Sequence, residues 1–227
     1  MATSSDARGP GLFRIGSVHL PEMSEMRLIL LGDSWYDKSS VTNLLLGSNM
    51  LNREREPNFP IKVCGRIMTT KTVLINTPDL LCPSISEPKL KEHVRRCLSL
   101  CFPGPHVFLL VVQLNLDEQQ KQRLYRILEL FNKDSFKHSL VLISTPGWET
   151  SASHYPFHPR HIRDLIKMCE EKWIRLQSNP KELLQKLSQI LTMNSLSYVT
   201  CGHPSQEPNE DAPLPLDSSV SLGMYEH

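Results

Sequence analysis

The chain has 227 residues, a formal net charge of +1, 40% hydrophobic residues and 22% charged residues. These values are typical of a soluble globular domain with tails, not of a wholly disordered chain. The near-neutral charge provides no polybasic surface for nucleic acid or for an anionic membrane. The apolar runs are too short to cross a bilayer, and residues 1–10 contain no apolar signal-peptide core. We therefore expect a cytoplasmic protein with no transmembrane segment and no nucleic-acid partner.

Composition divides the chain into three parts. Residues 1–24 are polar and rich in Ser, Gly and Pro, which predicts a flexible N-terminal arm. Residues 202–227 contain Pro, Ser, Asp and Glu with few large apolar side chains, which predicts a disordered C-terminal tail. Residues 25–197 carry regular apolar patterns, and we expect them to form the folded domain.

Strand-like and helix-like patterns alternate within that domain. In chain order we predict a strand at 26–31, a helix at 40–46, strands at 61–67 and 71–76, a helix at 89–100, a strand at 106–113, a helix at 118–131, a strand at 138–144, and helices at 160–176 and 180–193. Unbroken apolar runs are typical of strands buried on both faces of a parallel sheet, whereas apolar residues every three or four positions are typical of helices. The alternation predicts a three-layer α/β fold with a mainly parallel sheet and helices on both faces. Ligands of such folds bind at the carboxyl ends of the strands.

The loop between the first strand and the first helix is similar to a P-loop, whose sequence is Gly, four residues, Gly, Lys, then Ser or Thr. Gly32, Lys38 and Ser39 fall on that spacing, and Asp37 stands where the second Gly would be. In a P-loop the backbone N–H groups cradle phosphates, the lysine reaches the β- and γ-phosphates, and the hydroxyl binds Mg²⁺. The fold is therefore predicted to be of the P-loop NTPase type.

Two carboxylates in this loop oppose the binding of an anion. Asp37 lies beside the expected phosphate, and Asp33 lies in the same loop. The candidate nucleotide-binding residues are Gly32, Asp33, Ser34, Asp37, Lys38, Ser39 and Ser40. Asp33, Ser34 and Asp37 are also typical helix-capping and turn residues, which leaves a purely structural interpretation open.

Two aromatic residues, Trp35 and Tyr36, follow the first part of this loop. If exposed, they would indicate a surface for a protein partner and not a phosphate cradle. The interpretation we prefer is packing against the N-terminal arm or against the charged, proline-containing loop at 52–60.

Six cysteines occur without any Cys-x-x-Cys pair. His93, Cys97 and Cys101 are spaced by one helical turn and form a possible partial metal site, which would need a further ligand. We interpret the cysteines as small buried residues that stay reduced, because free cysteine is commonly buried and no secretory signal is present.

The longest family-specific stretch is Arg96 to Leu114, which reads RCLSLCFPGPHVFLLVVQL. It closely resembles the conserved box of the immunity-associated nucleotide-binding GTPases, the GIMAP group. It follows the P-loop-like segment and the turn Thr77-Pro78-Asp79 in the expected order, and the resemblance covers residues 25–195. The resemblance implies a septin-related G domain with roles in immunity, which binds GTP or GDP with Mg²⁺ and associates with itself or with other GIMAP-type GTPases.

The resemblance also implies particular site residues. Ser39 and Asn76 stand at the two positions that would contact Mg²⁺, and Trp148 and Glu149 stand in the loop that would read the guanine base.

The departures from the family pattern are concentrated at these ligand-facing positions. Asp37 and Asp79 replace two glycines, Asn76 replaces an aspartate, Trp148 stands where an aspartate reads guanine, and Ile61 aligns with a switch-loop threonine. We therefore predict weak GTP binding with absent or very slow hydrolysis, and no catalytic residue is assigned. The alternative is a pseudo-GTPase that binds other family GTPases without nucleotide. A third hypothesis, a hydrolase that uses His154, His158, His161 and Cys169, has only the residue types in its favour.

Overall fold

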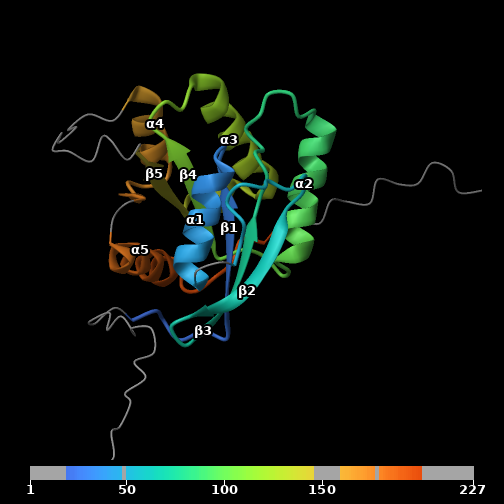
Figure 1. Ribbon diagram of the computed structural model, residues 1–227. Helices are drawn as coiled ribbons and strands as arrows, with labels where there is room; N and C mark the ends of the chain where they lie inside the picture. Colours follow the sequence, from blue (N-terminus) through green and yellow to red (C-terminus); the bar gives the residue numbers. More distant parts are fainter. Residues whose placement is uncertain (1–18, 48–49, 146–158, 177–178, 201–227) are drawn as a thin grey trace, which may run out of the picture.

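The computed structural model describes residues 19–47, 50–145, 159–176 and 179–200. Within these residues, six strands form one sheet in the order β2-β3-β1-β4-β5-β6 (Figure 1). The strands are β1 (Glu25–Leu31), β2 (Ile61–Ile67), β3 (Thr70–Asn76), β4 (Val107–Gln113), β5 (Ser139–Ser144) and β6 (Trp173–Arg175). The helices are α1 (Trp35–Leu46), α2 (Glu87–Leu100), α3 (Glu118–Phe131), α4 (Arg160–Met168) and α5 (Pro180–Met193), with a short 3₁₀ turn, η1 (Lys133–Phe136).

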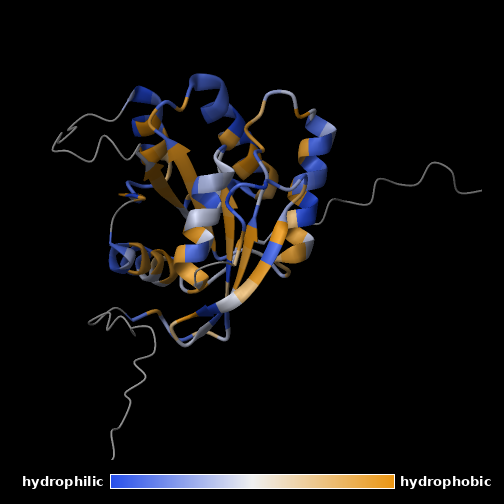
Figure 2. Ribbon diagram, in the orientation of Figure 1, coloured by the Kyte–Doolittle hydropathy of each residue, from blue (hydrophilic) through white to orange (hydrophobic). Residues whose placement is uncertain are grey.

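Helices cover both faces of the sheet, as predicted. Alternate residues of β1 point to opposite faces, so Ile29 and Leu31 join one core cluster while Leu28 and Leu30 join the other. The first cluster contains the apolar faces of α2, α3 and α4, and the second contains those of α1 and α5. The hydropathy colouring shows the apolar strands between helices with polar outer surfaces (Figure 2). The three-layer α/β prediction is therefore confirmed.

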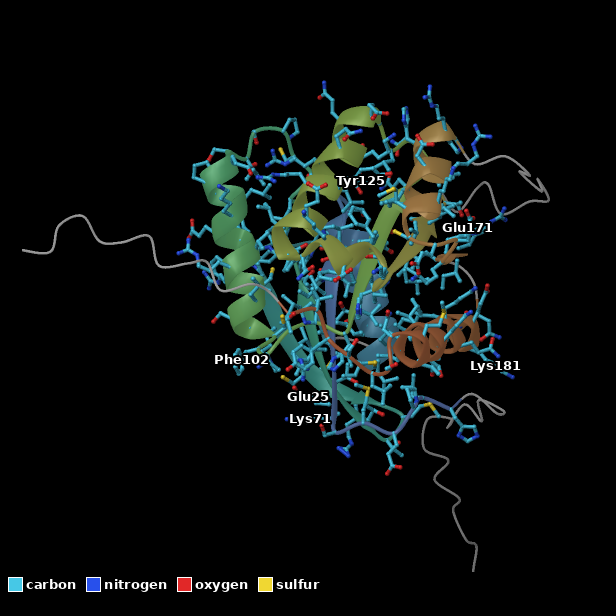
Figure 3. All side chains as sticks on the ribbon, turned by 180° about the vertical axis from the view of Figure 1, so that it is seen from behind. Glu25, Lys71, Phe102, Tyr125, Glu171 and Lys181 are labelled. Carbon is cyan, nitrogen blue, oxygen red and sulfur yellow. The ribbon has the colours of Figure 1, made fainter. Side chains whose placement is uncertain are left out.

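The sheet is mainly parallel, with β2 as an antiparallel edge strand. β1 pairs in parallel with β3 and β4, β4 with β5, and β5 with β6, whereas β2 and β3 form a hairpin. Glu25 and Lys71 mark the amino ends of β1 and β3, where Lys71 Nζ lies 2.8 Å from Glu25 Oε2 (Figure 3). The strands β1, β3, β4 and β5 consequently end at one edge of the sheet, which we call the rim.

The first helix begins earlier than the sequence pattern suggested. It was predicted from Ser40, but α1 starts at Trp35 because Ser34 caps it, with the Ser34 hydroxyl accepting from the Asp37 N–H. Asp37, Lys38 and Ser39 therefore lie in the first turns of a helix. Asp117 caps α3: its carboxylate accepts from the Gln120 N–H, and the Gln120 side chain accepts from the Asp117 N–H, which completes a capping box.

The predicted helix at 160–176 was wrong in its second half. α4 ends at Met168, and Trp173–Arg175 form β6, which pairs in parallel with β5. Between them Glu170 and Glu171 have φ of 55° and 59°, and the Glu171 N–H donates to the Ile166 carbonyl at 3.0 Å. This left-handed turn ends the helix and reverses the chain. Glu171 lies on the surface at this turn (Figure 3).

Replacing Glu171 with glycine is expected to raise the free energy of unfolding by about 0.5–1 kcal/mol, because glycine adopts the left-handed conformation without a Cβ penalty. Gln185→Gly is the matched control, since Gln185 is exposed within α5. There the same change should lower the free energy of unfolding by about 1 kcal/mol. Urea denaturation followed by circular dichroism measures both values. Equal destabilisation by the two changes would show that the turn carries no strain.

Among the described residues, no helix is both long enough and apolar enough to span a bilayer. Residues 1–18 and 201–227, which contain most of the predicted arm and all of the predicted tail, lie outside the described residues.

Candidate functional site

The P-loop-like segment connects β1 to α1 at the rim. Gly32 has φ +151°, and a Cβ at this position would overlap the carbonyl oxygen of Val111 in β4. Only glycine allows this close approach of the loop to the neighbouring strand. The Asp33 carboxylate accepts from the Ser34 N–H at 2.8 Å, and burial raises the pKa of Asp33 above its ordinary value. Asp33 and Ser34 thus shape the loop and the start of α1, which agrees with the structural interpretation of these two residues.

Lys38 lies completely buried beneath this loop. Its ammonium group donates to the carbonyl oxygen of Gly32 and, at 3.4 Å, to that of Pro78 at the end of β3. Burial lowers the pKa of Lys38 to about 8. Nearby carboxylates oppose that shift, in decreasing order Glu56, Asp79, Asp33 and Asp37. The predicted phosphate-binding cation is therefore present, with acidic groups from three segments of the chain around it.

Two neutral side chains at the rim are buried without a hydrogen-bond partner. Within the described ranges, these are the Ser39 hydroxyl and both amide atoms of Asn76, and both residues are 0% exposed. An unsatisfied buried polar group costs about 1–3 kcal/mol, so such groups call for an explanation. Oxygen ligands are the kind that Mg²⁺ prefers, and the two residues fit a Mg²⁺ site in ligand type although they supply no charge.

The segment after α1 folds back over the rim. Asn43 holds it by two hydrogen bonds to the backbone of Leu51, at 3.0 and 2.9 Å. The Trp35 indole N–H donates to the Asn52 carbonyl at 2.9 Å, and Trp35 is only 6% exposed. The preferred interpretation of Trp35, packing against the loop at 52–60, is therefore confirmed.

Tyr36 behaves differently from its neighbour. Its side chain is 57% exposed, and the Arg53 guanidinium lies 5.7 Å from the centre of its ring. A single exposed aromatic ring covered partly by a cation is not by itself a binding surface.

One contact of this segment was absent from the sequence prediction. Glu56 Oε1 accepts a hydrogen bond of 2.5 Å from the Asp79 N–H, across a separation of 23 residues. The Asp79 carboxylate itself accepts from the Leu81 N–H at 2.9 Å, which closes the turn after β3. No local pattern marks Glu56, because it is one charged residue in an irregular, charged loop.

Trp148 and Glu149, the predicted base-reading residues, lie outside the described residues, as do His154 and His158. His161 lies on α4, where its Nδ1 is 2.8 Å from Glu118 Oε2 of α3. Cys169 is completely buried, and burial raises the pKa of its thiol to about 12. A buried thiol held neutral is a poor nucleophile, which removes the basis of the hydrolase hypothesis.

The cysteine row on α2 is structural. Cys97 and Cys101 are buried, and burial raises the pKa of the Cys97 thiol far above its ordinary value. Within the described ranges, no group of three His, Cys, Asp or Glu side chains is placed to hold a metal ion.

At the carboxyl edge of this mainly parallel sheet, a strand leads through a glycine turn into a helix, and a lysine lies beneath the turn. This arrangement defines a fold of the P-loop NTPase type. The model of the AIG1 family matches residues 26–204. The chain therefore belongs to the AIG1 family, the family that includes the GIMAP proteins, and its domain is a GIMAP-type G domain.

Curated relatives agree with this assignment at low identity. GTPase IMAP family member 8 of Homo sapiens is 27% identical over 128 residues, which make up 54% of this chain and 19% of that protein. Immune-associated nucleotide-binding protein 1 of Arabidopsis thaliana is 23% identical over 194 residues, 76% of this chain and 82% of that protein. The chain thus spans about a fifth of the length of the human relative.

The fold is also that of a solved GTPase structure. Toc33 from Arabidopsis thaliana in complex with GDP and Mg²⁺ superposes with a TM-score of 0.62 at 17% identity, over 79% of this chain and 89% of that one. A second structure superposes with a TM-score of 0.55 at 18% identity, over 75% of this chain and 84% of that one. It belongs to the chloroplast translocon components atToc33 and psToc159, for whose GTPase activity dimerization is important. At these identities the likeness shows the fold alone.

Proposed function

We propose that this G domain binds guanine nucleotide weakly at the loop between β1 and α1, and that it hydrolyses GTP very slowly or not at all. The observation that carries the proposal is Lys38, a completely buried lysine at the P-loop position, surrounded by carboxylates. The lysine supports anion binding, and the carboxylates oppose it.

The electrostatic repulsion between these carboxylates and a bound phosphate is large enough to lower nucleotide affinity. One carboxylate about 8 Å from a phosphate costs about 2 kcal/mol at an effective dielectric constant near 20. That free energy corresponds to about a thirtyfold loss of affinity. Asp79 stands at the end of β3, where it adds such a charge to the phosphate side of the rim. The proposed affinity is accordingly lower than that of a P-loop without these carboxylates.

In this proposal Ser39 Oγ and Asn76 Oδ1 hold Mg²⁺, since both are buried without partners in the described structure. Bound Mg²⁺ would neutralise charge on the phosphates. Because Asn76 contributes no negative charge, it holds the ion less strongly than a carboxylate would. Hydrolysis depends on Mg²⁺ and on electrostatic stabilisation of the transferring phosphoryl group, so weak Mg²⁺ binding lowers its rate. Trp148 and Glu149 remain the predicted base-reading residues.

A second candidate function is that of a nucleotide-free interaction module. The segment over the rim favours it, because Glu56 already accepts from the Asp79 N–H and Lys38 already donates to the Pro78 carbonyl. In this function the partners are further copies of the chain or other GIMAP-type GTPases. A cytoplasmic location remains a prediction for both functions.

Isothermal calorimetry of nucleotide-free protein with GDP and GTP, with and without Mg²⁺, tests the primary function. We expect saturable, Mg²⁺-dependent heat that falls at least about tenfold in affinity in Lys38→Met, which keeps the aliphatic volume but removes the charge. Lys62→Met is the matched control, because Lys62 is exposed on β2. Folding of each variant is verified by thermal denaturation. No heat from folded protein at millimolar nucleotide would contradict nucleotide binding and favour the interaction module.

A further inference from the structure

The strongest unexplained feature of the rim is the position of the Glu56 carboxylate. Its Oε1 accepts from the Asp79 N–H at 2.5 Å, at the carboxyl end of β3. The adjacent residue, Pro78, offers its carbonyl oxygen to the Lys38 ammonium at 3.4 Å. The Glu56 carboxylate and the buried Lys38 ammonium therefore form hydrogen bonds with two adjacent backbone groups, at Asp79 and Pro78.

The chemistry of this arrangement is that of a bound anion. A carboxylate accepts hydrogen bonds from backbone N–H groups through charge-bearing oxygens, as a phosphate does. Of the acidic groups near Lys38, Glu56 has the largest electrostatic effect on that ammonium. Asp33, Asp37 and Asp79 contribute in the same direction.

The segment that carries Glu56 is anchored independently of this contact. Asn43 bonds to the backbone of Leu51, and Trp35 bonds to the carbonyl of Asn52. These contacts hold the chain over the rim four or five residues before Glu56. The other end is held by β2, which begins at Ile61, and by the Arg96 guanidinium 4.3 Å from the centre of the Phe59 ring. Loss of the Glu56 contact alone would therefore free the middle of the segment and leave both ends in place.

A P-loop lysine contacts the β- and γ-phosphates of a bound nucleotide. A third phosphate would extend past the lysine toward the end of β3, where Glu56 already holds the N–H donor. A diphosphate ends before that point. The terminal phosphate of a triphosphate and the Glu56 carboxylate thus compete for the same N–H donor, and both are attracted by the positive charge of Lys38.

We propose that Glu56 is a built-in substitute for a terminal phosphate, so that the site takes a nucleoside diphosphate in preference to a triphosphate. A triphosphate binds only after it displaces Glu56. This inference rests on the proposed function, because it names the ligand class of the same site.

Competitive titration of nucleotide-free full-length protein with GDP and GTP in the presence of Mg²⁺ tests the proposal. The wild-type protein is expected to bind GDP at least about tenfold more tightly than GTP. Glu56→Gln keeps an oxygen acceptor for the Asp79 N–H but removes the charge, and it is expected to reduce this preference about tenfold. Glu54→Gln is the matched control, because Glu54 is an exposed acid in the same segment. It should leave the ratio unchanged.

A second readout follows the segment itself. Trypsin cleaves after arginine. Arg53 and Arg55 are exposed, and they lie between the anchored residues Leu51 and Asn52 and the Glu56 contact. Glu56→Ala should be cleaved there at least about threefold faster than Glu54→Ala, and GTP should accelerate cleavage of the wild type more than GDP does.

The outcomes separate the two proposals. GDP binding that requires Lys38, together with an unchanged preference in Glu56→Gln, would overturn the inference about Glu56 and leave the proposed function standing. Equal cleavage of Glu56→Ala and Glu54→Ala would overturn it as well. Absence of binding of either nucleotide to every folded variant would overturn both.

Discussion

Replacing Gly32 with alanine is expected to lower the free energy of unfolding by more than about 4 kcal/mol, or to prevent folding. Two effects add at this position. The φ of +151° lies in a region that residues with a Cβ rarely adopt, and the new methyl group would overlap the Val111 carbonyl oxygen. Because Val111 belongs to the central strand β4, neither side of the contact has room to move.

Urea denaturation followed by circular dichroism measures this effect, and Gly47→Ala is its control. Gly47 has φ +110°, but a Cβ there has no atom within 4 Å. It is expected to cost about 1–2 kcal/mol, which reports the conformational penalty without the overlap. If Gly32→Ala costs no more than Gly47→Ala, the close approach of the loop to β4 would be wrong.

The second large effect is a loss of stability in acid that arises at the end of the sheet opposite the rim. His106 is 4% exposed there, and its Nδ1 accepts from the Arg27 N–H at 3.0 Å. Burial lowers the pKa of His106 to about 4, and the positive charge of Arg27 and the neighbouring His138 act in the same direction. Glu25 opposes the shift. The imidazole is therefore neutral in the folded protein at pH 7.

The sign of the pH dependence follows from that lowered pKa. The unfolded chain has a histidine pKa near 6.5, so between about pH 6.5 and 4 it binds a proton at this residue that the folded protein does not bind. The contribution of His106 is thus fully present above pH 6.5 and is lost as the pH falls toward 4. The shift from about 6.5 to about 4 corresponds to about 3 kcal/mol.

Urea denaturation at half-unit pH steps from 7.5 to 4 measures this loss. His106→Gln removes the titrating group but keeps a side-chain acceptor for the Arg27 N–H. Its free energy of unfolding should fall by about 3 kcal/mol less than that of the wild type over the same pH range. Identical pH profiles for the two proteins would show that the pKa of His106 does not change on folding.

The same contacts explain the family-specific box around residues 103–107. The Arg27 guanidinium donates to the Gly104 carbonyl at 2.6 Å and lies 5.2 Å from the centre of the Tyr198 ring. A Cβ at Gly104 would overlap the Val199 carbonyl oxygen, and the Val199 N–H donates to Pro105 at 2.8 Å. This part of the box therefore ties the segment after α5 to the amino end of β4, away from the rim.

Most of the fold was predictable because the central strands β1, β4 and β5 are buried on both faces. An unbroken apolar run such as that of β4 has no good alternative as an exposed element. The helix at 160–176 failed for an equally physical reason. Cys169 and Trp173 continue the helical spacing, and the reversal at Glu170 and Glu171 uses no glycine, asparagine or proline that would mark it.

The site was predictable only where it is local. The spacing from Gly32 to Lys38 places the lysine under the loop because strand, turn and helix are contiguous. The contact between Glu56 and Asp79 joins an irregular segment to a strand end 23 residues away, and no periodicity encodes it. The roles of Trp148 and Glu149 remain predictions, since both lie outside the described residues.

The hydrogen bond from the Val199 N–H to the Pro105 carbonyl holds the end of the described chain at the edge of the sheet opposite the rim. The described chain enters near His19, whose carbonyl accepts from Ser188 of α5, and it continues into the amino end of β1. It leaves at Thr200, whose carbonyl accepts from Asn132, just after α3 and before β5 begins. Both points of attachment thus lie at the pole opposite the rim. A surface, a fluorophore or a fused domain joined through either one would lie at the far end of the sheet from the loop between β1 and α1.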